Sequence, residues 1–128
     1  MKPEYYIKKI TAHLKLPDES WVTSECRLRE THAWPRQFLM YCLIKYEGYT
    51  LEVSGLVCNR DHSTANYAKK NVQNYLVNDQ IFQDYYSALD EMIHEEKVKE
   101  KIKKQGRPYR DYHISKRKNN KILPKYVL

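Results

Sequence analysis

The sequence predicts an all-α bundle of five or six helices, followed by a basic C-terminal tail. Apolar residues recur at helical spacing in several segments between residues 3 and 104. The 128 residues include only three glycines and five prolines, which argues against a turn-rich β fold. Hydrophobic residues make up 41% of the chain, enough for a small core. We therefore expect one folded domain over residues 1–104 and a flexible tail over residues 105–128.

The first helix is expected over residues 3–15, because Pro3 suits a helix start. Its apolar residues recur at helical spacing: Tyr6, Ile7, Ile10 and Leu14. The segment Leu16-Pro17-Asp18 ends this helix. A short helix within residues 19–26 would bury two apolar side chains, Trp21 and Val22. Residues 27–34 are expected to be irregular.

The central helix is expected between Pro35 and Gly48. Proline is favoured at the first helical position, and glycine is favoured just past the last one. The residues from Phe38 to Ile44 are apolar without interruption, so this helix has no polar face. A helix of this kind is covered on all sides by other elements. We therefore predict that it forms the core of the bundle.

Two helices joined by a short link follow. Thr50 can cap the first, which runs to Val57 and contains Gly55 at a cost in helix propensity. A glycine there suits a close helix crossing. The second helix is expected from Asp61, after the link Cys58-Asn59. Its two faces separate clearly: Ala65, Ala68, Val72 and Leu76 point one way, and His62, Asn66, Lys69 and Gln73 point the other.

The last helix is expected to begin at Asn78-Asp79, which ends the preceding helix and caps the next one. Its apolar stripe consists of Ile81, Phe82, Tyr85, Tyr86, Leu89, Met92 and Ile93. The pattern continues less regularly through Val98 and Ile102, and Gly106-Arg107-Pro108 ends it. Residues 109–128 mix aromatic and basic side chains without a period, which predicts disorder in the free protein.

The net charge of +7 is distributed unevenly along the chain. Residues 97–128 contain twelve Lys or Arg against two acidic residues, a net charge of +10. Residues 1–96 contain eleven basic against fourteen acidic groups, a net charge of −3. A near-neutral body with a cationic tail is typical of a folded module that has an electrostatic arm for a polyanion. A tail that is basic only for solubility is the simpler alternative.

The sequence does not indicate an enzyme, a metal site or a cofactor. The three cysteines, Cys26, Cys42 and Cys58, lie sixteen residues apart, which is not the spacing of metal-binding cysteines. Their odd number, in a protein expected to be cytosolic, predicts reduced thiols. The acidic residues of the last helix are expected to form a solvated face: Asp90, Glu91, Glu95 and Glu96. No G-x-x-x-x-G-K-[ST] motif is present, so we expect no nucleotide cofactor. The longest apolar run has seven residues, which predicts no membrane partner and a cytoplasmic location.

A cluster of hydrogen-bonding side chains, Arg60-Asp61-His62-Ser63-Thr64, opens the helix after the short link. Two short helices joined tightly, with such residues at the start of the second, are typical of a helix-turn-helix that enters DNA. An aspartate can accept a hydrogen bond from the cytosine amine, and a histidine can contact base edges. The simpler interpretation is that Asp61 only caps the helix.

This motif resembles the one in the C-terminal DNA-binding domain of the bacterial replication initiator DnaA. That family has Arg-Asp-His-Thr/Ser-Thr at the start of its recognition helix and Pro-Arg-Gln on its central helix upstream. Here Arg60 to Thr64 and Pro35-Arg36-Gln37 match both motifs in order. The resemblance covers approximately residues 5–93. It implies a Trp-repressor-like helix-turn-helix domain that binds double-stranded DNA with sequence specificity.

The resemblance also implies roles for individual residues. Asp61 and His62 would read bases in the major groove. Either Arg27 or Arg29 would enter the minor groove, whose negative potential attracts arginine. The residues expected at phosphates are Arg36, Gln37, Arg60, Ser63 and Thr64, together with Asn66, Lys69 and Lys70 on the following turns of the helix.

The chain departs from the family pattern at three points. It has Cys58-Asn59 where the family usually has a Gly-Gly pair, and Ser54 where glycine is common. The turn between the two helices can therefore differ from the family's. The chain also has no ATPase domain, so the resemblance extends to DNA reading alone.

Three functions are open at this point. The first is a stand-alone, sequence-specific DNA-binding protein that acts in replication initiation or its regulation. The second is a promoter-binding transcriptional regulator that uses the same interface. The third is an RNA- or polyanion-binding interaction protein that uses the basic tail, in which tyrosines could stack on unpaired bases: Tyr109, Tyr112 and Tyr126. The tail could also bind a protein partner.

Overall fold

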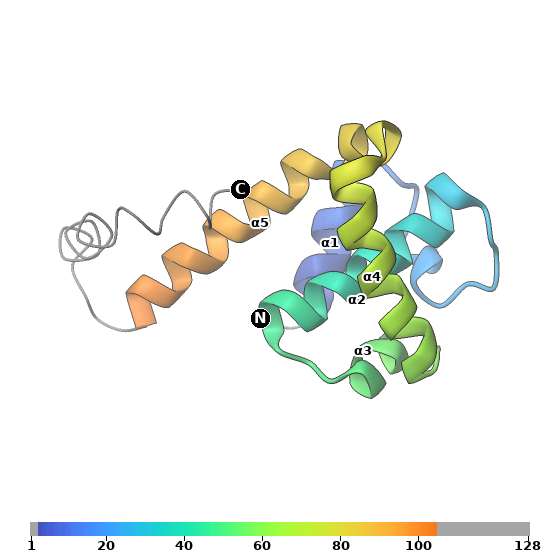
Figure 1. The fold of residues 1–128 in the computed structure, drawn as a ribbon, viewed down its shortest axis with the longest axis horizontal. Coiled ribbons are helices and arrows are strands. Elements are labelled where there is room, and N and C mark those ends of the chain that lie inside the picture. Colours follow the sequence, from blue (N-terminus) through green and yellow to red (C-terminus); the bar gives the residue numbers. More distant parts are fainter. Residues whose placement is uncertain (1–2, 105–128) are drawn as a thin grey trace. The chain divides into compact units, whose positions relative to one another are not determined.

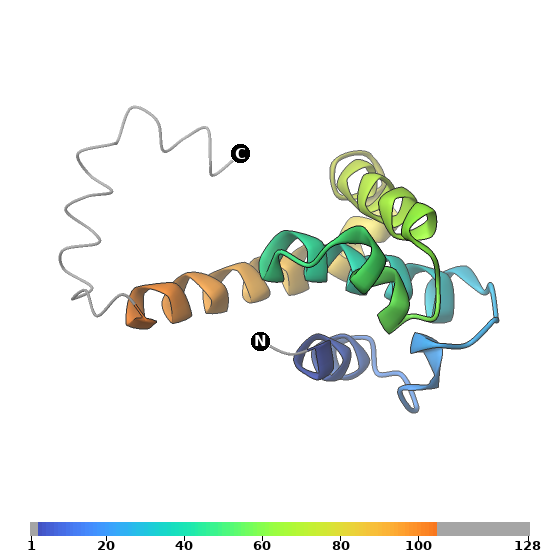
Figure 2. The same ribbon diagram turned by 90° about the horizontal axis from the view of Figure 1, so that it is seen from below.

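The computed structural model describes residues 3–104, which form helices joined by short links (Figures 1 and 2). In chain order the elements are α1 (Pro3–His13), the 3₁₀ turn η1 (Ser20–Val22), the π-helical turn η2 (Arg29–Ala33), α2 (Trp34–Glu47), α3 (Leu51–Val57), α4 (His62–Asn78) and α5 (Gln80–Lys104). Residues 3–104 contain no strand, so the predicted all-α class is confirmed. The expected tail, residues 105–128, lies outside the described residues.

The chain divides into two compact units, the first ending at Glu91 and the second beginning at Met92. The first unit contains α1 to α4 and the opening residues of α5. It also contains every residue for which the resemblance implies a DNA contact. Within the described part of the chain, no helix is both long enough and apolar enough to cross a membrane.

Helix α2 is the centre of the first unit, as its apolar sequence predicts. Every side chain from Phe38 to Leu43 is buried. Helices α1, α3 and α4 all pack against it, and α4 crosses it at a steep angle in Figure 1. Pro35 lies in the first turn, and Gly48 ends the helix with a left-handed backbone (φ 69°), so both predicted helix ends are confirmed.

An aromatic cluster joins α2 to the opening residues of α5. Its ring centroids lie 5.1 Å apart for Trp34 and Phe82, 4.8 Å for Phe38 and Tyr86, and 4.3 Å for the stacked pair Phe82 and Tyr86. Tyr75 of α4 adds a contact with Phe82 at 5.3 Å. Aromatic side chains bury large apolar areas, and these geometries add to that burial. The cluster therefore fixes three helices to one another.

Helix α1 is held from two sides. Its residues Tyr6 and Ile10 are fully buried, and the Tyr6 hydroxyl donates a hydrogen bond to Glu47 at the end of α2. The indole N–H of Trp21 in η1 donates to the Thr11 hydroxyl at 3.0 Å. Trp21 and Val22 are both buried, as the sequence predicts. The turn η1 thus closes over α1 and carries the chain toward α2.

Helix boundaries in the first third of the chain differ from the prediction. Helix α1 ends at His13 rather than at residue 15, because Lys15 adopts a left-handed conformation (φ 55°) and the Leu16 amide turns back to the Thr11 carbonyl. Only Ser20–Val22 is helical within residues 19–26. Residues 29–33, expected to be irregular, form the turn η2 that leads directly into α2. Local backbone hydrogen bonds decide such ends, and apolar spacing does not report them.

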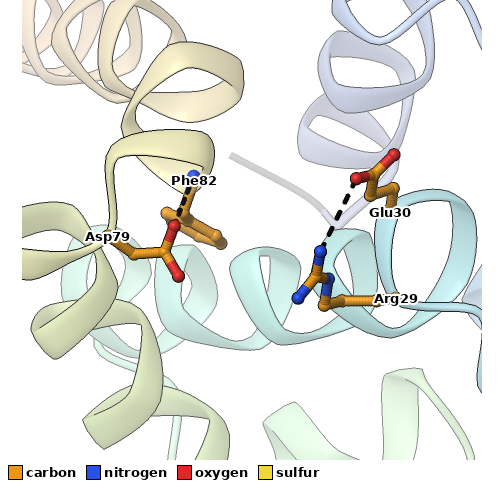
Figure 3. A network of polar contacts seen from close by, with 4 residues as sticks. All are labelled: Arg29, Glu30, Asp79 and Phe82. Atoms are coloured by element: carbon orange, nitrogen blue, oxygen red, sulfur yellow. Dashed lines mark hydrogen bonds and ion pairs between the residues drawn. The ribbon is translucent and has the colours of Figure 1, made fainter.

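The beginning of α5 follows the prediction, but its apolar stripe is only partly buried. Asp79 caps the helix by accepting a hydrogen bond from the Phe82 amide at 3.0 Å (Figure 3). The buried members of the stripe are Phe82, Tyr86, Leu89 and Ile93, whereas Ile81, Tyr85 and Met92 are 40% to 49% exposed. The seven residues cover a wider arc of the helix than its neighbours reach, so those at the edges of the arc face solvent.

Neighbouring residues of α5 should therefore differ sharply in their effect on stability. We expect Phe82→Ala to lower the free energy of unfolding by about 3–5 kcal/mol, because it empties the middle of the aromatic cluster. Ile81→Ala removes a side chain that is 49% exposed and should cost about 1 kcal/mol or less. Urea unfolding followed by circular dichroism measures both. Equal losses in the two variants would contradict the packing described here.

Candidate nucleic-acid interface

The segment with the expected DNA-reading motif consists of α3, the turn at residues 58–61 and α4, called the α3–α4 unit below. Thr50 caps α3, with its hydroxyl oxygen accepting a hydrogen bond from the Val53 amide at 3.2 Å. Helix α4 packs on both α2 and α3. Its inward side chains Ala65, Ala68 and Val72 are buried, as predicted, and Leu76 is half-buried. The small alanines let the beginning of α4 lie close to the helices beneath it.

The turn between α3 and α4 is closed by hydrogen bonds of the main chain. The Arg60 amide donates to the Gly55 carbonyl at 2.7 Å, and the Asn59 amide donates to the Leu56 carbonyl at 3.0 Å. This pattern ends a helix with one residue in the left-handed region, a position usually taken by glycine. Here Asn59 takes it, with φ 56°. Asparagine tolerates this conformation better than most residues, so the chain makes a tight turn without the Gly-Gly pair.

Gly55 lies directly under the backbone of this turn. A Cβ atom at residue 55 would lie 2.6 Å from the Asp61 carbonyl oxygen and 2.7 Å from that of Arg60. Both distances are far below a van der Waals contact, and neither atom belongs to a flexible side chain. The expectation of a close helix crossing at Gly55 was wrong in its partner: the backbone that approaches Gly55 is the turn at Arg60 and Asp61, not another helix.

Asp61 caps α4. Its Oδ1 accepts a hydrogen bond from the Thr64 amide at 2.9 Å. This hydrogen bond, followed by one with the Thr64 side chain, lowers the pKa of Asp61 below its usual value. The capping interpretation is therefore correct for the free protein. The carboxylate is also exposed and negatively charged at neutral pH. A carboxylate can accept further hydrogen bonds, so base reading stays a prediction beside this structural role.

The outward side of α4 presents a polar surface, called the α4 face below. Its exposed residues are His62, Ser63, Thr64, Tyr67, Lys70 and Gln73, and its half-buried residues are Asn66 and Lys69. Tyr67, 65% exposed, was not among the residues expected at DNA. Its position outside the apolar spacing of α4 was the available signal for this exposure.

The two arginines considered for the minor groove differ in their surroundings. The Arg29 guanidinium lies 4.8 Å from the centre of the Trp34 ring. It also lies 3.8 Å from a Glu30 carboxylate oxygen (Figure 3). Arg27 is exposed, and no hydrogen bond or ion pair joins it to another described residue. Arg27 is therefore the more available of the two for a ligand.

Arg36 and Arg60, both expected at phosphates, are turned toward the protein. Arg36 is only 6% exposed, and its two terminal nitrogens donate to the carbonyls of Trp21 at 3.0 Å and Cys26 at 2.5 Å. Arg60 donates to the Ser24 carbonyl at 2.7 Å. Burial, followed by the nearby charge of Arg60, lowers the pKa of Arg36. Arg36 is thus buried, whereas Arg60 is half-exposed, and the phosphate contacts that the resemblance implies for both side chains stay predictions.

Gln37, also expected at a phosphate, is half-buried on α2, and its Oε1 has no hydrogen-bond partner among the described residues. Arg36 is therefore less exposed than any residue of the α4 face, whereas Gln37 is half-buried, as Asn66 and Lys69 are. In the part of the chain that the structure describes, no three His, Cys, Asp or Glu side chains are grouped so as to hold a metal ion.

Comparison of the chain with known protein families, with curated proteins and with solved structures finds no match. The resemblance to the initiator domain therefore rests on the motif residues alone.

The stability of the α3–α4 unit should depend on Gly55. We expect Gly55→Ala to lower the free energy of unfolding by about 1–3 kcal/mol, although alanine is the better helix former, because the added Cβ collides with two carbonyl oxygens. The neighbouring Ser54 provides a matched control. Its hydroxyl is fully buried without a hydrogen-bond partner in the described structure, so Ser54→Ala should be neutral or stabilising by up to about 1 kcal/mol. Chemical denaturation compares the two variants, and a Gly55→Ala protein as stable as the wild type would refute the close approach.

Proposed function

We propose that this protein binds double-stranded DNA with sequence preference, with the α4 face in the major groove and residues 23–28 at the minor groove. The observation that carries this proposal is the exposure of the motif side chains Asp61, His62, Ser63 and Thr64 at the N-terminus of α4. The major groove admits an α-helix, and a helix N-terminus attracts phosphate through its free amides and its dipole.

The charges near the α4 face also favour DNA as the ligand. Lys69 and Lys70 lie on the second turn after the motif, and Arg27 is exposed. Residues 1–96 have a net charge of −3, so the attraction of this part of the chain to DNA comes from the local placement of such cations. In this proposal Asp61 and His62 contact base edges, Arg27 enters the minor groove, and hydroxyls, amides and lysines contact phosphates.

The biological role follows from the resemblance. We propose that the protein acts in replication initiation or its regulation, in the cytoplasm, and uses no nucleotide cofactor. A promoter-binding regulator would use the same contacts and differ only in the location of its site on the DNA. The polyanion-binding alternative rests on the net charge of +10 over residues 97–128.

Two measurements test the DNA-binding proposal: the sequence preference of the wild-type chain, and the reduction of that preference in a variant of Asp61. Selection from random duplexes should enrich one sequence with the full chain. Asp61→Ser retains a good N-cap residue but removes the carboxylate that would accept a hydrogen bond from a base. It should reduce discrimination at one base pair by roughly 5- to 150-fold, the usual worth of a base contact.

Asp18→Ser is the matched control for this experiment. Asp18 is also exposed and accepts a hydrogen bond from a backbone amide, that of Ser20 at 2.9 Å, but it lies between α1 and η1. Its replacement should leave the selected sequence and the affinity unchanged. Failure of the wild-type chain to enrich any sequence would refute the proposal.

The basic tail should strengthen binding without changing the preferred sequence. Replacing Lys116, Arg117 and Lys118 with glutamine in the full chain removes three positive charges. If all three contact duplex phosphates, the slope of log affinity against log salt should fall by about 2.7. Replacing Tyr109, Tyr112 and Tyr126 with leucine should leave binding to the selected duplex unchanged. A large loss in the tyrosine variant, with an unaltered slope in the charge variant, would favour the stacking alternative.

A further inference from the structure

Residues 23–28 connect η1 to η2 without regular secondary structure. Within the segment, only Leu28 is fixed by backbone hydrogen bonds to η2: its carbonyl accepts from the His32 amide at 3.0 Å and from the Ala33 amide at 2.9 Å. A local hydrogen bond from the Cys26 amide to the Ser24 hydroxyl, 3.0 Å long, shapes the segment internally. Its location relative to the rest of the first unit depends on side chains that reach it from elsewhere.

Arg60 is one of these side chains. Its backbone belongs to the turn before α4, where its amide donates to the Gly55 carbonyl. One terminal nitrogen donates to the carbonyl of Cys58 at 2.9 Å and to that of Asn59 at 3.3 Å, both within the turn. The other donates to the Ser24 carbonyl, 36 residues earlier in the chain, at 2.7 Å. A single guanidinium thus joins the turn to residues 23–28.

Arg36 holds the same segment from α2. It donates to the carbonyls of Trp21 and Cys26, so the two arginines bind carbonyls on both sides of Glu25. No ion pair joins either arginine to a carboxylate of the described residues. Two adjacent cations without an anion are unfavourable unless hydrogen bonds compensate for them. Five main-chain carbonyls provide this compensation: those of Trp21, Ser24, Cys26, Cys58 and Asn59.

We propose that Arg60 is a positioning residue that, together with Arg36, holds residues 23–28, and thus Arg27, in a fixed place relative to the start of α4. This inference rests on the proposed function, in which Arg27 contacts the minor groove while α4 lies in the major groove. Both contacts can form without a further loss of backbone freedom only when residues 23–28 and the start of α4 already have fixed positions relative to each other before DNA binds. The motif arginine then contributes to affinity through Arg27 rather than through a phosphate.

Arg60→Lys separates positioning from charge. A guanidinium directs its terminal nitrogens at separate acceptors in a fixed plane, whereas an ammonium is a point charge on a flexible stem. The variant therefore retains the positive charge beside the DNA and loses the double connection between the turn and Ser24. Arg29→Lys is the matched control, because Arg29 lies next to the same segment and contacts Trp34 and Glu30 instead.

The first measurement uses the free protein. Amide order parameters of residues 24–28 should be near about 0.85 in the wild type and in Arg29→Lys, the value of a rigid backbone, and should fall toward about 0.6 in Arg60→Lys. Unchanged order parameters in Arg60→Lys would overturn the inference regardless of any result with DNA.

The second measurement is a double-mutant cycle on the selected duplex. Arg60→Lys should weaken binding by roughly tenfold in the wild type and by no more than about twofold when Arg27→Ala is already present. The salt dependence should not change between Arg60→Lys and the wild type. Equal losses in both backgrounds would show that Arg60 acts independently of Arg27 and would overturn the inference alone. Failure of the wild-type chain to select a duplex would instead overturn the proposed function, and this inference with it.

Discussion

Helix α2 is apolar from Phe38 to Ile44, and a helix of this kind is stable only when other elements cover all of its sides. Helices α1, α3 and α4 and the beginning of α5 provide that cover. The position of α4 follows from this constraint, since Ala65 and Ala68 allow its first turns to lie close to the helices beneath. The polar side of α4 is then exposed because its other side is required by the core.

A second constraint acts where the chain has no regular structure. Backbone carbonyls that are taken out of water need hydrogen-bond donors, and residues 24–28 have no repeating secondary-structure hydrogen bonds to supply them. Arg36 and Arg60 provide these donors. Asp61 similarly provides an acceptor for the first turn of α4. Residues of the Arg60–Thr64 motif therefore stabilise the α3–α4 unit, and a match to the motif does not by itself distinguish such support from contact with a ligand.

The order and type of the helices could be predicted from the sequence, because apolar spacing records which side of a helix is buried. Most helix ends were also predicted correctly, since capping is a local interaction; these ends were marked by Pro35, Gly48, Thr50 and Asp61. The end of α1 and the turn η2 were predicted incorrectly. They depend on backbone hydrogen bonds and on packing against segments far away in the sequence.

The sequence by itself determined that the protein is all-α, that α2 is its core, and that α4 has one apolar and one polar side. It also identified Asp61 as a helix cap, whereas the segment that approaches Gly55 is the turn rather than the helix expected there. Only the tertiary structure decided that Arg36 is buried, that Arg60 donates to the Ser24 carbonyl, that Asn59 completes the turn, and that Arg27 is more available than Arg29. The reason is physical: the helix pattern depends on neighbours three or four residues apart, whereas the direction of an arginine depends on carbonyls that the fold brings to it from elsewhere in the chain.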